Sequence, residues 1–339
     1  NSYLHNDSFP ASHELSVGPL GYCGSKAAME LISQADVVLA LGSRLNPFGT
    51  TPQYGFDYWP KNATLIQIDA DHRTLGLTKK VAIGICGDAK AGATRLLEHA
   101  RELDRGRARN DGTIRKIADA RKAWQDELDG LSAKSGEPIS PRHALKLVSE
   151  ALPTDCVVTT DIGNISSVSN SYLRFENPRR FLAAMSFGNC GYSYPTALGA
   201  KLARPDLPVV AFVGDGAWGM SLAEVMTAVR ENIPVVAIVW NNAQWGAEKK
   251  NQVDYYSDRF VGTNLENPDF AEVARAMGAQ GIKVDKASEI QNAVRTAIAS
   301  GKPTVINLIV DSIELAEPFR RDALKKPVRL LDAYKHLKG

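Results

Sequence analysis

Two short apolar runs near the middle of the chain form its clearest structural unit. Residues 209–213 and 235–240 are rich in β-branched side chains, and an amphipathic segment over 221–232 separates them. Runs of this length and composition predict buried strands, and the period of the segment between them predicts a helix. The expected unit is therefore strand, helix, strand, with the two strands parallel.

Runs of the same kinds continue along the chain. Further strands are expected at 37–41, 65–68, 81–85, 156–160, 281–284 and 304–310, and the first of these is expected to be buried. Helices are expected at 26–35, from about 90 to 100, at 113–131, from Ser140-Pro141 onward, at 195–203, from about Phe270 onward and at 289–299. This alternation predicts an α/β protein with two doubly wound domains and mainly parallel sheets, the first a partial Rossmann-like domain.

Composition divides the chain into four parts. Residues 1–104 hold three expected strands, an incomplete sheet whose N-terminal part we expect to have been removed or to belong to another polypeptide. Residues 105–138 mix basic and acidic side chains without strand-like runs, which predicts a solvated linker with one charged helix. A second α/β domain over 139–315 and a basic tail over 316–339 follow.

Bulk composition narrows the class of protein. The 339 residues are 44% hydrophobic and 23% charged with a net charge of +2, which favours neither a nucleic-acid nor a membrane partner. Acidic residues interleave with the basic ones in the linker and no aromatic stacking set accompanies them, which also disfavours nucleic acid. We expect a cytoplasmic protein, although a chain that begins at Asn1 without Met leaves open a missing leader. The four cysteines show no metal-site spacing.

Polar clusters follow both central strands. Gly214-Asp215-Gly216 ends the first and Asn241-Asn242 ends the second, and open α/β sheets bind ligands at the carboxyl ends of their strands. The glycines formally match a dinucleotide fingerprint, but that fold needs an acidic residue where the two asparagines stand. A carboxylate inside the turn would repel phosphate unless a cation lies between them. The pattern therefore predicts a site for Mg²⁺ and a diphosphate, with a helix beginning at Ala217.

The spacing Gly-Asp-Gly, 24 residues, Asn-Asn resembles the signature of thiamine-diphosphate enzymes. The resemblance implies thiamine diphosphate and Mg²⁺ as cofactors, with Asp215, Asn242 and the backbone carbonyl of Gln244 as metal ligands. The second domain is then the diphosphate-binding domain, and the first is the central domain of that family. The implied cofactor-binding residues are Asn164, Gly188, Cys190, Gly214, Asp215, Gly216, Ala217, Asn242 and Gln244.

Two loops supply the rest of this expected site. The turn over 161–164 is either a plain strand-to-helix connection or, as the family implies, a loop that presents Asn164 to the far side of the diphosphate. The carbonyl of Gly188 is expected to accept a hydrogen bond from the cofactor's 4′-amino group. Cys190 stands where relatives carry a bulky apolar residue that bends the cofactor. A nucleophilic role for Cys190 is disfavoured because no His lies near it in sequence.

Several short stretches of the sequence resemble one branch of the family. The stretches 16–27, 44–48, 187–192, 244–249 and 317–323 resemble the sulfoacetaldehyde acetyltransferases. The resemblance implies conversion of sulfoacetaldehyde and phosphate to acetyl phosphate and sulfite, within the degradation of taurine and other C2 sulfonates. Both substrates are anions, and the expected cations are Lys249, Arg320 and Arg321.

The family also implies what the chain lacks. Its cofactor is activated by a glutamate on a pyrimidine-binding domain, which is expected in a missing N-terminal part or another chain, so the chain alone is expected to be inactive. The expected assembly is a homodimer or homotetramer. An acetolactate-synthase-like carboligase and a non-catalytic, cofactor-holding subunit remain alternatives. Two further questions have two possible answers each. Asp69 and Arg44 are either part of a nucleotide site or parts of a structural domain, and the tail is either a lid or an exposed terminus.

Overall fold

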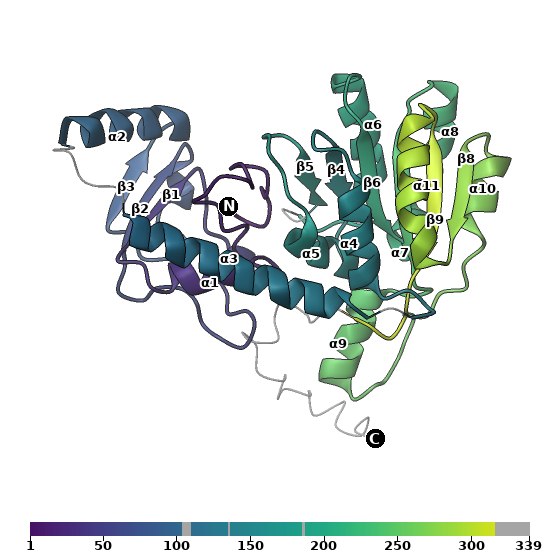
Figure 1. The fold of residues 1–339 in the computed structure, drawn as a ribbon, viewed down its shortest axis with the longest axis horizontal. Coiled ribbons are helices and arrows are strands. Elements are labelled where there is room, and N and C mark those ends of the chain that lie inside the picture. The colour runs from purple at the N-terminus through teal and green to yellow at the C-terminus, as the bar shows by residue number, and fades with distance from the viewer. Residues whose placement is uncertain (104–109, 135, 185–186, 316–339) are drawn as a thin grey trace.

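The computed structural model describes residues 1–103, 110–134, 136–184 and 187–315. It contains two separate sheets, both with all strands parallel. The two sheets lie at opposite ends of the molecule, and helix α3 (Asp111–Ser132) runs along one side between them (Figure 1). The expected α/β class with parallel sheets is therefore confirmed.

The larger sheet has six strands in the order β5-β4-β6-β7-β9-β8. In chain order its strands are β4 (Val157–Thr160), β5 (Phe181–Ala183), β6 (Val209–Gly214), β7 (Val236–Asn241), β8 (Gln280–Val284) and β9 (Thr304–Ile309). Its helices are α4 (Pro141–Ala151), α5 (Asn164–Tyr172), α6 (Ser193–Ala203), α7 (Asp215–Ser221), α8 (Glu224–Arg230), α9 (Gly246–Tyr256), α10 (Phe270–Ala276) and α11 (Ala287–Ala299). The chain reverses its direction of travel across the sheet between β4 and β6, which places a ligand-binding crevice at their carboxyl ends.

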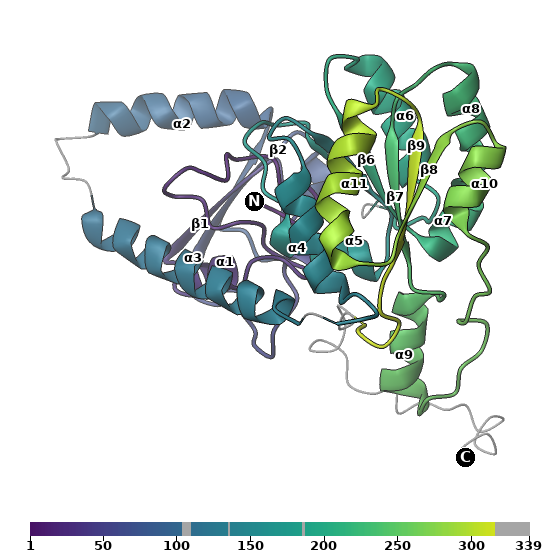
Figure 2. The same cartoon turned by 45° about the vertical axis from the view of Figure 1, so that its right-hand side comes forward.

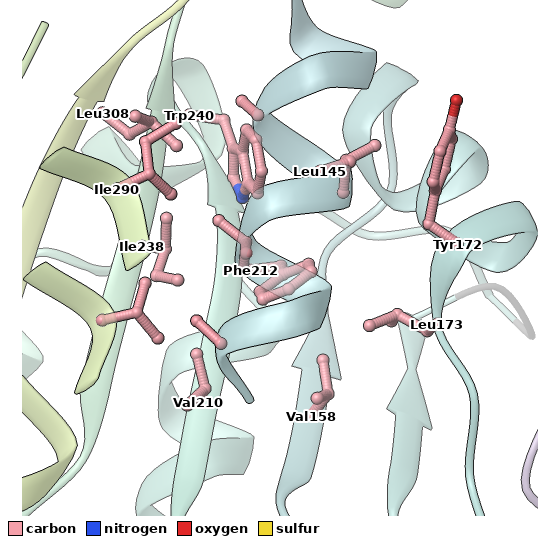
Figure 3. Close-up of a cluster of buried hydrophobic side chains, with 14 of the residues drawn as sticks. Leu145, Val158, Tyr172, Leu173, Val210, Phe212, Ile238, Trp240, Ile290 and Leu308 are labelled. Carbon is pink, nitrogen blue, oxygen red and sulfur yellow. The ribbon is translucent and has the colours of Figure 1, made fainter. Parts of the chain in front are cut away.

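Both faces of this sheet are covered, which explains the unbroken apolar runs of its central strands. Successive side chains of β6 alternate between two cores: Val210 and Phe212 pack toward α4, α5 and α11, whereas Ala211 and Val213 pack toward α6, α8 and α10. Figure 3 shows the first of these cores, in which Phe212 and Trp240 make an edge-to-face contact at 5.6 Å. This packing fixes where β6 and β7 end, and with them the polar clusters that follow.

The smaller sheet has the order β1-β2-β3, with β1 (Val37–Leu41), β2 (Thr64–Asp69) and β3 (Ile83–Cys86). Helices α1 (Lys26–Ile32) and α2 (Ala89–Leu103) precede and follow it. The expected strand at 37–41 is confirmed, but its expected burial is wrong for the described residues, since Val37 is 56% exposed and Leu39 45%. The run of apolar residues predicts the strand, whereas the burial of that strand depends on what lies against it.

Helix α3 corrects the prediction of a solvated linker. The helix itself is confirmed, but Trp124 and Leu128 are buried in the same core as Leu145 of α4. Figure 2 shows α3 lying beside α1 and reaching the start of α4. The charges occupy the outer face, so composition alone hid an inner apolar stripe.

Three local features differ from the expected pattern. The helix expected at 221–232 is the shorter α8, and the helix expected to begin at Ala217 is α7, which begins at Asp215. Strand β5 and helix α9 were not expected, since β5 has three residues and α9 buries none of its residues. Within the described ranges no helix has both the length and the apolar character that crossing a bilayer would require.

Candidate cofactor site

A cavity of about 260 Å³ opens at the carboxyl edge of the larger sheet. Eight of the nine expected cofactor-binding residues line it: Asn164, Cys190, Gly214, Asp215, Gly216, Ala217, Asn242 and Gln244. They come from the starts of α5 and α7, the end of β6, the segment after β7 and the loop before α6. Gly188, the ninth, does not line the cavity; its N–H donates to the carbonyl of Ala184 at 2.7 Å.

Asp215 is the carboxylate of this cavity, and it is 3% exposed. Its Oδ1 accepts the N–H of Gly216 at 3.0 Å, and its Oδ2 accepts the N–H of Gln244 at 3.2 Å and the side-chain amide of Asn267 at 2.8 Å. Burial raises the pKa of Asp215, and these hydrogen bonds oppose that shift. A cation beside Oδ1 would stabilise the ionised form further.

The paired asparagines after β7 have different tasks. Asn241 is buried, and its side chain turns into the protein, where it donates to Asn307 and accepts the N–H of Ala243. Asn242 lines the cavity. The sequence placed both at one strand end, and the structure shows that Asn242 is the one available to a ligand.

The side-chain amide of Asn164 lies near that of Asn242 in the lining of the cavity. Asn164 begins α5, and its buried Nδ2 has no hydrogen-bond partner within the described residues. A side chain added at Gly246 would meet Asn164 Nδ2 at 3.0 Å and Asn242 Nδ2 at 3.4 Å. Gly246 thus keeps open a small space between two amides, and an unpartnered buried donor such as Asn164 Nδ2 suits an anionic ligand.

The loop before α6 is attached to the end of β4 by a buried carboxylate. Asp161 Oδ1 accepts the N–H groups of Tyr192 at 2.7 Å and Ser193 at 3.2 Å, while its Oδ2 is buried without a partner in the described part of the chain. Burial raises the pKa of Asp161 to about 6 despite these hydrogen bonds. Burial likewise raises the pKa of Cys190 to about 11, so that its thiol is neutral near pH 7, in keeping with the expectation that it is not a nucleophile.

The expected substrate cations are not placed in the cavity. Lys249 is absent from its lining; its Nζ donates to Gln244 Oε1 at 2.8 Å and to Asn264 Oδ1 at 2.9 Å. Arg320 and Arg321 lie outside the described residues. Their roles stay predictions.

The sequence did not indicate Lys134, Arg142 and Glu314, which line the cavity beside α4. Lys134 pairs with Glu314 at 3.0 Å, and Arg142 lies near the phenol of Tyr172. Strand and motif patterns could not reveal them because Lys134 and Glu314 lie in loops 180 residues apart and Arg142 lies in the first turn of α4.

These residues fit a diphosphate held through a divalent cation. No group of three or more His, Cys, Asp or Glu in the described ranges could hold a metal on its own. A magnesium ion here would therefore depend on Asp215, on neutral oxygens such as those of Asn242 and Gln244, and on phosphate oxygens, which is a set that Mg²⁺ accepts. The open space at Gly214, where an added Cβ would meet nothing within 4 Å, admits a ligand close to the backbone.

Comparison with protein families agrees with this geometry. Residues 161–308 match the family described as thiamine pyrophosphate enzyme, C-terminal TPP binding domain, and residues 1–96 match the thiamine pyrophosphate enzyme, central domain. The chain belongs to the thiamine pyrophosphate enzymes, and thiamine diphosphate is the cofactor of its second domain.

Sequence identities to individual relatives are higher for the acetyltransferases than for an acetolactate synthase. The chain is 53% identical to the sulfoacetaldehyde acetyltransferase of Castellaniella defragrans over 99% of its own length and 59% of the relative. It is 45% identical to the sulfoacetaldehyde acetyltransferase of Roseovarius nubinhibens over 96% of the chain and 57% of the relative. Similarity to the acetolactate synthase large subunit of Corynebacterium glutamicum is 30%, over 89% of the chain and 48% of the relative. The chain thus spans 57–59% of the length of the two acetyltransferases.

Proposed function

We propose that the protein to which this chain belongs is a sulfoacetaldehyde acetyltransferase, which converts sulfoacetaldehyde and phosphate to acetyl phosphate and sulfite. The observation that carries the proposal is the 53% identity to the Castellaniella defragrans enzyme over 99% of the chain, against 30% to the acetolactate synthase large subunit of Corynebacterium glutamicum. Thiamine diphosphate, when bound, supplies the nucleophilic carbon and the electron sink that this redistribution of bonds requires. The reaction needs no external oxidant, because oxidation of the aldehyde carbon to an acyl carbon is matched by reduction of the sulfur-bearing carbon to a methyl group as the C–S bond breaks and sulfite leaves.

The residues of this chain hold and orient the reactants. Asp215, Asn242 and the carbonyl of Gln244 would bind Mg²⁺, and Asn164 would donate to the diphosphate. Arg142 offers a cation at the cavity wall in addition to the expected Arg320, Arg321 and Lys249. Since sulfonate and phosphate are both anions, at least one of these cations is expected to contact each substrate.

The test uses the full-length protein with thiamine diphosphate, Mg²⁺ and phosphate. Release of sulfite from sulfoacetaldehyde together with acetyl phosphate would support the proposal, and an Asp215→Ala variant should abolish both products. Formation of acetolactate from pyruvate without sulfite release would overturn it in favour of a carboligase. Absence of turnover with either substrate in a cofactor-loaded protein would instead favour a non-catalytic subunit.

The cation roles are tested separately. Replacement of Arg320 and Arg321 by Ala should raise the KM for phosphate or for sulfoacetaldehyde, and unchanged values of both would contradict the role. Arg142→Ala and Lys249→Ala are measured in the same assay. A larger rise in KM for one of these variants shows whether a substrate anion is bound by the cation that lines the cavity, Arg142, or by Lys249, which is hydrogen-bonded to Gln244 and Asn264.

Two further parts of the proposal concern assembly. The chain by itself is expected to give no acetyl phosphate, because the activating glutamate belongs to a pyrimidine-binding domain. The expected assembly is a cytoplasmic homodimer or homotetramer, and the mass of the native full-length protein measures its subunit number.

A further inference from the structure

Asn267 contacts the carboxylate of the cofactor cavity from a distant part of the chain. It lies just before α10, and its Nδ2 donates to Asp215 Oδ2 at 2.8 Å and to Asn241 Oδ1 at 3.0 Å. Neither the Gly-Asp-Gly motif nor the paired asparagines point to this residue, which does not line the cavity. Its position behind Asp215 is what the fold adds to the motif.

Asn267 is the end of a ladder of side-chain hydrogen bonds. Asn241 Nδ2 donates to Asn307 Oδ1 at 3.1 Å, and Asn307 Nδ2 donates to Asp269 Oδ1 at 3.1 Å. Asp269 also caps α10 by accepting the N–H of Ala271 at 2.9 Å. The ladder thus runs beneath the carboxyl ends of β7 and β9, from Asp215 to the start of a helix.

The carboxylates at the two ends of the ladder determine how each asparagine amide between them is oriented. A carboxylate accepts, so Asn307 must turn its NH₂ group toward Asp269 and its oxygen toward Asn241. Asn241 must then offer its NH₂ group to Asn307 and its oxygen to Asn267. The same reasoning leaves Asn267 with its NH₂ group facing Asp215, which means that the network always presents a donor to Oδ2.

This arrangement treats the two oxygens of Asp215 differently. Oδ2 already accepts from both Asn267 and the backbone of Gln244, whereas Oδ1 accepts from its neighbour Gly216. A carboxylate oxygen has two in-plane acceptor directions, so the unfilled direction belongs to Oδ1.

We propose that Asn267 is a positioning residue for the metal: by occupying Oδ2 and fixing the carboxylate plane, it makes Asp215 a one-oxygen ligand that binds Mg²⁺ through Oδ1. The inference rests on the proposed Mg²⁺ site and assigns a partner to its carboxylate. Partners that orient a metal ligand in this way typically change metal affinity by 10–100-fold when they are removed.

The test measures metal affinity without turnover. Mg²⁺ is titrated into metal-free full-length protein at saturating thiamine diphosphate, with tryptophan fluorescence as the signal, since the indole of Trp245 packs against Gly216. Asn267→Ala should raise the Mg²⁺ dissociation constant at least about 10-fold. Asn307→Ala, two links away, should raise it less, and Asn267→Ser, which keeps one donor, should lie between the wild type and Asn267→Ala.

The control is Asn292→Ala, which removes the same side chain from the exposed surface of α11 and should leave the dissociation constant unchanged. Thermal unfolding of the metal-free variants separates a loss of folding from a loss of affinity, and Asn267→Ser stands in if Asn267→Ala does not fold. Equal Mg²⁺ affinity in folded Asn267 variants and the wild type overturns the inference while leaving the proposed reaction intact. A wild type that binds no Mg²⁺ with thiamine diphosphate overturns the cofactor site as well.

Discussion

The buried carboxylate of Asp161 should make the stability of the protein fall as the pH rises. Its side chain is fully buried, and its pKa is raised from 3.8 to about 6, mainly by burial. A raised pKa in an acid means that the folded state holds the proton more tightly than the unfolded state does. Its contribution therefore favours folding at low pH and is lost between the unfolded and folded pKa values.

The size of the effect follows from the shift. A shift of about two pKa units, at about 1.4 kcal/mol per unit, means that Asp161 changes the free energy of unfolding by about 3 kcal/mol over its whole titration. Between pH 4.5 and 7.5, about 2 kcal/mol of this should be lost, because part of the change occurs below that window. An Asp161→Asn variant cannot titrate, yet its amide oxygen still accepts the N–H groups of Tyr192 and Ser193.

The assay compares chemical denaturation of cofactor-free wild type and Asp161→Asn at a series of pH values. The amide places a donor where Oδ2 has no partner, which adds a cost that does not vary with pH. The difference in free energy of unfolding should therefore shift by about 2 kcal/mol toward the variant from pH 4.5 to 7.5. The exposed Asp119→Asn on α3 is the control. A difference that stays constant with pH would refute the reasoning.

Three further outcomes test the packing around the site. Trp124→Ala should destabilise the protein by about 3–5 kcal/mol in chemical denaturation, because α3 is packed rather than solvated; a cost below about 1 kcal/mol would restore the linker interpretation. Gly216→Ala should weaken thiamine diphosphate binding in calorimetry, since the new Cβ would lie 2.7 Å from the ring of Trp245; unchanged affinity would show that the ring gives way without cost. Cys190 should react with iodoacetamide far more slowly than the exposed Cys86 at pH 7.5, as measured by peptide mass spectrometry, and equal rates would contradict the raised pKa of Cys190.

Much of the fold was predictable from local sequence. β1 lies where the apolar run at 37–41 placed it, β6 is one residue longer than predicted, and β7 is shifted by one residue. β6 and β7 could be located because parallel strands buried on both faces need unbroken apolar runs, whereas β1 followed from its short apolar run although that run is largely exposed. The helix expected at 221–232 exists as α8 but is shorter at both ends, and its start is set by a turn at Leu222 and Ala223, which the apolar period does not mark.

The candidate site divides in the same way. The sequence by itself determined that Asp215 and Asn242 lie close together, since they follow adjacent parallel strands and any such sheet brings strand ends to one edge. Tertiary structure alone decided that Asn241 turns inward and Asn242 toward the cavity, that Asp161 holds the loop before α6, and that Asn267 reaches Asp215 from 52 residues away. The reason is physical: strand formation depends on neighbours in sequence, whereas the direction and hydrogen bonding of a buried polar side chain depend on which distant segments the fold places against it.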